Sequence, residues 1–271
     1  MKVTFKRFIW LFLLVLSVIS SGLAHKLRIQ FQGVRQPPNL TLSVCIPATK
    51  RDFEDGRLER LLQSIQNQTH KPDEVIIAIS ETHSTSMSDL VGRLVRPLEP
   101  IRIRLLQSRE VLNQAQNRNK AARLSTGDII SFIDADDVMH PLRTEIIRAT
   151  FQDNPLIDLV LHNCTTANEP EWYSAMYLHR FSGHVVTKDS ICDAEKVTRG
   201  TQVNLPLAVH HAHNSIRRRV FVDHQYDESY DVYRQEDSVF VRQCVQSICA
   251  DVRRSMILLL APLTFYDVYR N

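Results

Sequence analysis

Three carboxylates stand within four residues at the end of an apolar run. Asp134, Asp136 and Asp137 directly follow Ile129–Ile133. Carboxylates this close repel one another, and at the end of a buried strand the repulsion is costly unless a cation neutralises it. Hard oxygen ligands suit Mg²⁺ or Mn²⁺, especially where the metal also holds substrate phosphates. The pattern indicates a divalent-cation site, while spacing alone leaves open an acidic turn that caps the next helix.

The segments that must position these carboxylates alternate between strand and helix patterns. The expected strands are Leu42–Ile46, Glu74–Ile79, Ile101–Leu106 and Asp128–Ile133. The expected helices are Gly56–Gln66, Ser88–Leu94 and Ala115–Leu124. This alternation predicts a parallel α/β sheet, whose ligands bind beyond the carboxyl ends of the strands. The metal candidate is expected at that edge, where the strands end at Pro47, Ser80, Gln107 and Asp134.

Five segments resemble, in order, the motifs of one enzyme family. They are Leu42–Lys50, Leu61–Val75, Asn117–Asp137, Ser215–Phe221 and Tyr226–Asp237. Each motif alone is common, but five in this order resemble the family-2-like glycosyltransferases with the GT-A fold. The resemblance covers roughly residues 41–245 and matches weakly in the middle.

The resemblance implies an α/β GT-A domain over residues 41–271, with a mostly parallel sheet flanked by helices, behind an N-terminal hydrophobic segment. It further implies a hexosyltransferase-type enzyme that moves a single sugar from a nucleotide-diphosphate donor, expected to be a UDP-sugar, to an acceptor hydroxyl. The acceptor is a glycan, a protein or a lipid. Inversion at the anomeric carbon and dependence on Mn²⁺ or Mg²⁺ are expected, since a divalent cation stabilises a departing diphosphate.

The same resemblance assigns roles to individual residues. Asp136 is the first expected metal ligand, with Asp134 or Asp137 contacting the metal, the ribose or water. Asp237 is the expected base that takes the proton from the attacking hydroxyl, and Glu236 orients the acceptor or the base. Without the family context this acidic pair reads as a helix cap. The expected nucleotide-sugar contacts are Pro47, Thr49, Glu81, Arg118, Asn119 and Asp134.

The chain departs from the family pattern at two motifs. The turn after the second strand lacks the usual aspartate pair, so Glu81 or Ser80 must replace an aspartate that reads uracil. The motif of processive synthases is absent after Asp237, which favours transfer of one sugar over polymer synthesis. No histidine follows His224, so a C-terminal histidine ligand is not expected.

Two other functions stay open. A catalytically inactive relative that binds glycans in the lumen is disfavoured because all three acidic centres are intact, but sequence does not exclude it. A nucleotidyltransferase would need a glycine-rich phosphate loop after the first strand, and the chain has Pro47–Lys50 there and only 7 glycines. The formal charge of +3, without a basic run interleaved with aromatics, argues against nucleic acid.

The N-terminus predicts entry into the secretory pathway. Lys2, Lys6 and Arg7 precede the apolar run Phe8–Ala24, which is at the short limit for a membrane-spanning helix. The run is expected to be a signal anchor with the enzyme in the lumen, or a signal peptide cleaved before His25. Residues 25–40 would form a stem. The expected location is the Golgi or ER lumen, as a single-pass type II membrane protein or a secreted one.

Three sequons are candidate glycan acceptors in that compartment, at Asn39, Asn67 and Asn163. The five cysteines have no metal-ligand spacing. Cys45 is expected to be a buried thiol. In an oxidising lumen Cys192 is expected to pair with Cys164 or Cys244, a choice that sequence leaves open.

The middle of the chain holds aromatic residues and a histidine cluster. Trp172 or Tyr173 is expected to stack on a sugar or to fill the core. Strand alternation would place His211 and His213 on one face and His210 on the other, which favours pocket lining over metal binding.

Overall fold

The first strand, β1 (Leu42–Thr49), is buried along almost its whole length, as an apolar strand covered on both faces must be. The computed structural model describes residues 39–82, 91–95, 100–166, 170–179, 185–197, 211–229 and 235–266, all within one compact unit, Asn39–Asn271. On one side β1 pairs in parallel with β2 (Glu74–Ser80), which pairs with β3 (Arg102–Gln107); on the other it pairs with β4 (Ile129–Phe132). These are the four predicted strands, with ends shifted by one to three residues.

Beyond β4 the sheet is mixed. The order is β3-β2-β1-β4-β8-β6-β9-β5, and β7 pairs with β9. The added strands are β5 (Val138–Met139), β6 (Ile157–Thr165), β7 (Val185–Thr187), β8 (Ser215–Arg217) and β9 (Ser255–Phe265). Strand β8 lies antiparallel between β4 and β6, and the hydroxyls of Ser131 and Ser215 are 2.8 Å apart across the β4–β8 pair. The expected parallel pairing therefore holds for the first four strands and for the β6–β9 pair, whereas the other pairs are antiparallel.

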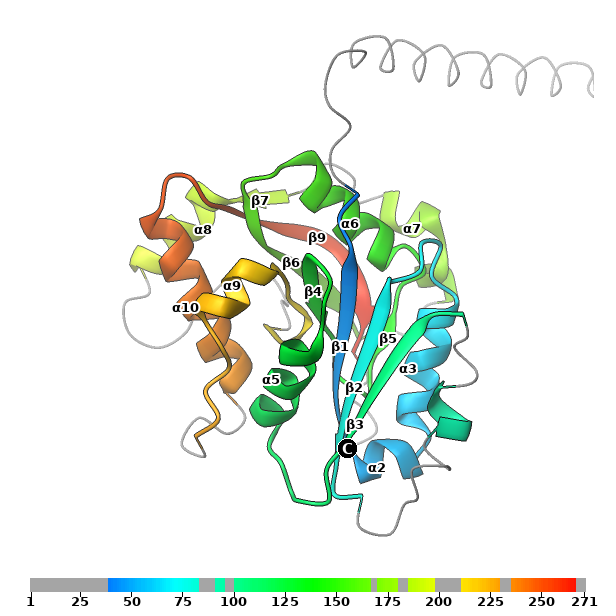
Figure 1. The fold of residues 1–271 in the computed structure, drawn as a ribbon. Helices are drawn as coiled ribbons and strands as arrows, with labels where there is room; N and C mark the ends of the chain where they lie inside the picture. Colours follow the sequence, from blue (N-terminus) through cyan, green and yellow to red (C-terminus); the bar gives the residue numbers. More distant parts are fainter. Residues whose placement is uncertain are drawn as a thin grey trace, which may run out of the picture. The chain divides into compact units, whose positions relative to one another are not determined.

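Helices cover both faces of the sheet (Figure 1). One apolar core lies under α2 (Lys50–Glu54), α3 (Arg57–Gln66), α6 (Arg143–Asp153) and α7 (Ala175–His179). The other lies under α5 (Gln114–Leu124), α8 (Lys188–Val197), α9 (Arg218–Asp223) and α10 (Glu236–Ala250). The predicted helices Gly56–Gln66 and Ala115–Leu124 are confirmed to within one residue. Of the predicted helix Ser88–Leu94, residues 88–90 lie outside the described residues, and Val91–Val95 forms one π-helical turn, η1.

Gly127 brings the start of β4 against β1. Its backbone N–H donates to the Ser43 hydroxyl at 2.8 Å, and that hydroxyl donates to Glu74 at 2.7 Å. A Cβ on residue 127 would stand 2.5 Å from Ser43 Oγ and 2.8 Å from the Ser43 nitrogen. Only a glycine fits this close approach of the two backbones.

The disulfide joins Cys192 of α8 to Cys249 of α10. Both predicted partners of Cys192 were wrong, because the pairing depends on two helices that meet only in the folded chain. Cys45 is a buried thiol, as expected. None of the helices that the structure describes has both the length and the apolar content needed to cross a bilayer, and Phe8–Ala24 lies outside those residues.

Candidate active site

The candidate site lies at the edge of the sheet where β1, β2 and β4 end. The turn Asp134–Asp137 follows β4 and is closed by a hydrogen bond from the Asp137 nitrogen to the Asp134 carbonyl (3.3 Å). Glu81 follows β2 with a left-handed φ of 63°, a conformation that costs a non-glycine residue free energy. The acidic turn and Glu81 therefore lie beyond the carboxyl ends of their strands, as expected, and their functional roles stay predictions.

Arg118 of α5 joins two of the predicted acidic groups. Its guanidinium donates to Asp134 at 2.6 Å and to Glu236 at 2.7 Å, and its side chain is only 2% exposed. Burial alone would lower the Arg118 pKa, but Asp134 and the other neighbouring acids raise it, so the charge is retained. The resemblance implied a diphosphate or sugar contact for Arg118, which stays a prediction; in the structure the guanidinium binds the two carboxylates.

Asn119 holds a neighbouring segment rather than facing an open site. Its side chain is fully buried, donates to the Tyr226 carbonyl (2.8 Å) and Glu228 (2.7 Å), and accepts from the Tyr226 nitrogen (3.0 Å). All of its amide is thereby engaged. Asn119 thereby fixes the segment that leads to α10, and the donor contact expected of it stays a prediction.

Glu236 and Asp237 stand at the beginning of α10, as predicted. Glu236 is buried against Arg118, and Asp237 is partly exposed. One Asp237 oxygen accepts from the Ser238 nitrogen at 2.7 Å. A carboxylate is favoured at a helix N-terminus by the helix dipole, so this position suits an acidic side chain.

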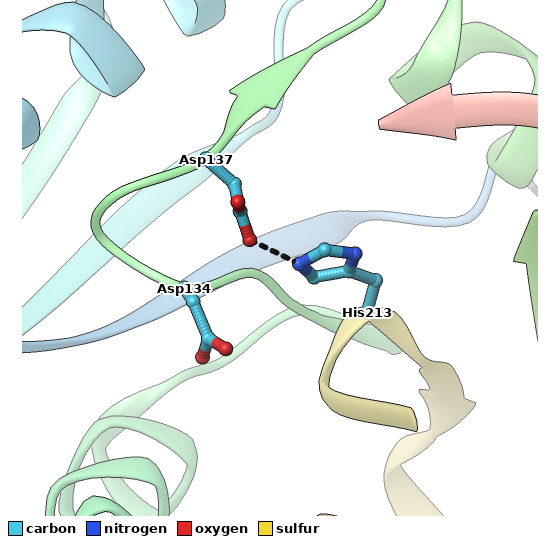
Figure 2. A group of neighbouring side chains, drawn as sticks. All are labelled: Asp134, Asp137 and His213. Carbon is cyan, nitrogen blue, oxygen red and sulfur yellow. Dashed lines mark hydrogen bonds and ion pairs between the residues drawn. The ribbon is translucent and has the colours of Figure 1, made fainter. Parts of the chain in front are cut away.

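A second buried network lies behind the aspartate turn. Asp137, fully buried, is 2.5 Å from Nε2 of His213, and Figure 2 shows the imidazole pointing at that carboxylate. Burial lowers the pKa of His213 to about 3, so the ring is neutral. Arg143, also buried, donates to the Phe132 carbonyl (3.0 Å) and to His162 (3.2 Å), whose ring stacks on His213.

Three ligand atoms near this network suit a divalent cation. One atom each of Asp134, Asp137 and His213 lies within 4.8 Å of the others. Figure 2 shows Asp137 and His213 pointing at each other, whereas the Asp134 carboxylate is directed at neither of them. Cis ligands at about 2.1 Å from an octahedral metal are about 3.0 Å apart. The 2.5 Å contact between Asp137 and His213 must therefore open slightly before both bind one ion. The two carboxylates suit Mn²⁺ or Mg²⁺, while the imidazole suits a transition metal, so the set favours Mn²⁺ over Mg²⁺.

Asp136, the first expected metal ligand, lies outside this group of three. Its side chain is 33% exposed, with Arg57 3.8 Å away, and its carbonyl accepts from Arg60 at 2.6 Å. Burial, and then repulsion from Asp137 and Asp134, raises its pKa to about 7. A cation beside Asp134 would weaken that repulsion, so the charge of Asp136 is coupled to the charges of Asp134 and Asp137 although Asp136 is not one of the three ligands.

The predicted nucleotide-binding residues Thr49 and Glu81 line one cavity of about 390 Å³, together with Asn113 and Asn117. Thr49 also donates two hydrogen bonds to the Asp52 carboxylate at the start of α2, from its backbone nitrogen (2.8 Å) and its hydroxyl (2.9 Å). Pro47 is buried within β1 instead of lying at its end. Its missing N–H costs no ladder bond, because the β1–β4 pairing ends at Cys45.

Asn117 was not predicted from the sequence as a site residue, and His213 was set aside. Asn117 bonds the Ala48 carbonyl (3.2 Å) and the Ser80 hydroxyl (3.1 Å), joining the ends of β1 and β2. The only sequence signal for Asn117 was its position beside Arg118.

His211–His213 forms a 3-10 helix instead of the expected strand, and this turns His213 toward Asp137. His210 lies outside the described residues. Trp172 is a core residue, donating to the Pro262 carbonyl, whereas Tyr173 is half exposed.

Comparison with known proteins identifies the family. A model described as glycosyl transferase family 2 matches residues 43–224. The chain belongs to glycosyl transferase family 2. An uncharacterized glycosyltransferase of Haemophilus influenzae is 29% identical over 130 residues, 47% of this chain and 41% of that protein. Another, of Methanocaldococcus jannaschii, is 23% identical over 181 residues, 63% of this chain and 62% of that protein. The chain spans less than two thirds of either relative.

Solved structures confirm the GT-A fold of this family 2 domain. Staphylococcus aureus TarS (residues 1–349, with UDP) superposes with a TM-score of 0.59 at 16% identity, covering 84% of this chain and 61% of that one. The mannosyltransferase PcManGT of Pyrobaculum calidifontis, with GDP-Man and Mn²⁺, gives 0.56 at 17% identity, covering 95% and 68%. The family match, and not these structures, makes this a glycosyltransferase domain, and it does not support a nucleotidyltransferase.

Proposed function

We propose that this chain transfers one sugar from a nucleoside-diphosphate sugar to an acceptor hydroxyl, with Mn²⁺ or Mg²⁺ held by Asp134, Asp137 and His213. The observation that carries the proposal is Arg118, which ties the acidic turn after β4 to the acidic start of α10 beside the three-ligand group. PcManGT with GDP-Man and Mn²⁺ and TarS with UDP support a nucleotide-sugar donor.

The residues of this chain divide the chemistry between them. When bound, the cation supplies positive charge for the departing diphosphate. Asp237 Oδ2 takes the proton of the acceptor hydroxyl, while Oδ1 stays hydrogen-bonded to the Ser238 nitrogen. Glu236 is fixed by Arg118 and so holds the start of α10 close to the strand ends where the donor binds. Attack from the Asp237 side, opposite the diphosphate, inverts the anomeric carbon.

The donor's nucleoside fits the cavity lined by Thr49, Glu81, Asn113 and Asn117. Its place beyond the carboxyl ends of β1 and β2 is where open α/β sheets bind nucleotides. The Glu81 carboxylate can accept a hydrogen bond from an N–H of the base, as the family's aspartate does from uracil. A UDP-sugar is therefore the first donor to test.

The proposed location is a secretory lumen, with Phe8–Ala24 as a signal anchor or signal peptide. The Cys192–Cys249 disulfide supports it, because disulfides persist in oxidising compartments. The proposed acceptor is a glycan, protein or lipid of that compartment.

The experiment measures release of free nucleotide from a panel of UDP- and GDP-sugars by the full chain, with Mn²⁺ and then with EDTA. Release from one donor that EDTA abolishes is expected. Asp237→Asn should slow turnover by about 10²–10⁴-fold and leave Mn²⁺-dependent donor binding intact. Asp153→Asn, at an exposed position on α6, is the matched control. Glycan binding without nucleotide binding or release would refute the transferase and favour the inactive glycan-binding relative.

A further inference from the structure

The three sequons of the chain differ in their structural setting. Asn67 is exposed and caps the end of α3. The next residue, Gln68, is buried and anchored: its amide donates to the Ser64 and His140 carbonyls (3.1 and 2.8 Å) and accepts from the Thr144 nitrogen (3.0 Å). The turn is thus fixed from beneath while the Asn67 side chain faces solvent, so a large substituent there displaces nothing in the core.

Asn39 is exposed in the same way, just ahead of β1. The following Leu40 is buried, and Thr41 is tied to the Asp128 carboxylate through its backbone nitrogen (2.9 Å) and its hydroxyl (2.7 Å). Asn39 and Thr69, the last residue of the Asn67 sequon, line the same open cavity of about 460 Å³. The two sequons therefore share one face of the molecule.

Asn163 has a different environment. It lies inside β6, where it pairs with Pro262 of β9 in an irregular part of the register. Its side-chain oxygen accepts a hydrogen bond from the Cys164 nitrogen at 3.0 Å, and the residue is partly buried. A glycan at this position would have to leave from the interior of a nine-stranded sheet.

We infer that Asn39 and Asn67 carry N-linked glycans and that Asn163 does not. In each modification the side-chain Nδ2 attacks the anomeric carbon of a lipid-diphosphate-linked oligosaccharide; the C–N bond forms, the lipid diphosphate leaves, and Nδ2 loses a proton. The inference rests on the proposed lumenal placement and is independent of the sugar transfer that the chain itself performs.

The positions of Asn39 and Asn67 are compatible with catalysis at the candidate site. Strand β1 runs from Leu42, beside Asn39, to Thr49 at the candidate site. At about 3.3 Å per residue its two ends are about 23 Å apart. Glycans on Asn39 and Asn67 therefore cover the amino ends of the strands and leave the carboxyl ends open to donor and acceptor.

The test is translation of the full chain with eukaryotic microsomal membranes, followed by protease protection and by intact mass before and after an N-glycosidase. The wild-type chain should carry two removable glycans, Asn39→Gln and Asn67→Gln one each, and the double variant none. Asn163→Gln is the matched control and should still carry two. The double variant should also keep the metal-dependent nucleotide release of the wild-type chain.

A protected wild-type chain without glycans, or a double variant that still carries one, would overturn the inference and leave the transferase proposal standing. A chain that stays accessible to protease would overturn it together with the lumenal placement. Loss of nucleotide release in Asp237→Asn has no bearing on glycan number, so the two proposals fail separately.

Discussion

Replacing Arg118 with methionine should destabilise the folded chain strongly, because two carboxylates would lose their partner. Asp134 and Glu236 have side chains only 15% and 9% exposed, and each is within 2.7 Å of the guanidinium. Removing one partner of a buried ion pair costs about 3–5 kcal/mol, since the remaining charge stays buried and unpaired. We expect Arg118→Met to lower the free energy of unfolding by that amount, measured by urea denaturation in EDTA.

Arg123→Met is the matched control, on the same helix. Arg123 and its partner Glu228 are 51% and 38% exposed and 3.2 Å apart, so the loss should stay below about 1 kcal/mol. Added Mn²⁺ should stabilise Arg118→Met more than Arg123→Met, because a cation at Asp134 replaces part of the missing charge. Equal destabilisation of the two variants in EDTA would refute the argument that Arg118 organises the site.

Three further predictions follow from other contacts. Asp158→Ala should cost about 3–5 kcal/mol in urea denaturation, because this fully buried carboxylate pairs with two arginines at 2.7 and 2.5 Å; a loss below 1 kcal/mol would contradict it. Gly127→Ala should lower the free energy of unfolding by about 1–3 kcal/mol because the added methyl group overpacks the contact with Ser43. Gly92→Ala, with open space around residue 92, should be neutral or slightly stabilising. Equal effects of the two substitutions would argue against the close approach at Gly127. The pKa of Asp136, raised to about 7, means that the folded chain holds a proton that the unfolded chain has lost, so its contribution to stability declines as pH rises from about 4 to 7. In EDTA, the free energy of unfolding of Asp136→Asn should therefore rise relative to that of the wild type across that pH window, by at most about 2 kcal/mol after solvent screening. A difference between the two that does not depend on pH would contradict this prediction.

Local patterns were sufficient for the first half of the fold. The strands β1, β2 and β4 and the helices α3 and α5 follow from apolar runs and helical spacing, which depend on neighbours in sequence. Strand β8 has only three residues and is held by partners on β4 and β6, so no local pattern distinguishes it. The mixed half of the sheet was therefore not predictable from periodicity.

The same division applies to the site. The carboxylates of Asp134 and Asp137 were predicted from their clustering, and their metal-binding roles stay predictions. His213 was set aside because strand alternation was assumed, yet its orientation depends on a contact with Asp137, 76 residues away. The position of Arg118 between two acids depends likewise on Glu236, 118 residues away. Spacing along the chain carries no information on such pairs.

The Cys192–Cys249 disulfide has a consequence for how the site is assembled. The cross-link encloses a sequence separation of 57 residues, within which lie His213, Glu236 and Asp237. A loop of that length restricts the unfolded chain by about 4 kcal/mol in the chain-entropy model. Asp134, Asp137 and Arg118 lie outside the loop. Once the disulfide has formed, one half of the site therefore lies within a closed loop and the other half outside it, so the cross-link limits how far the first half can separate from α8 when the chain unfolds.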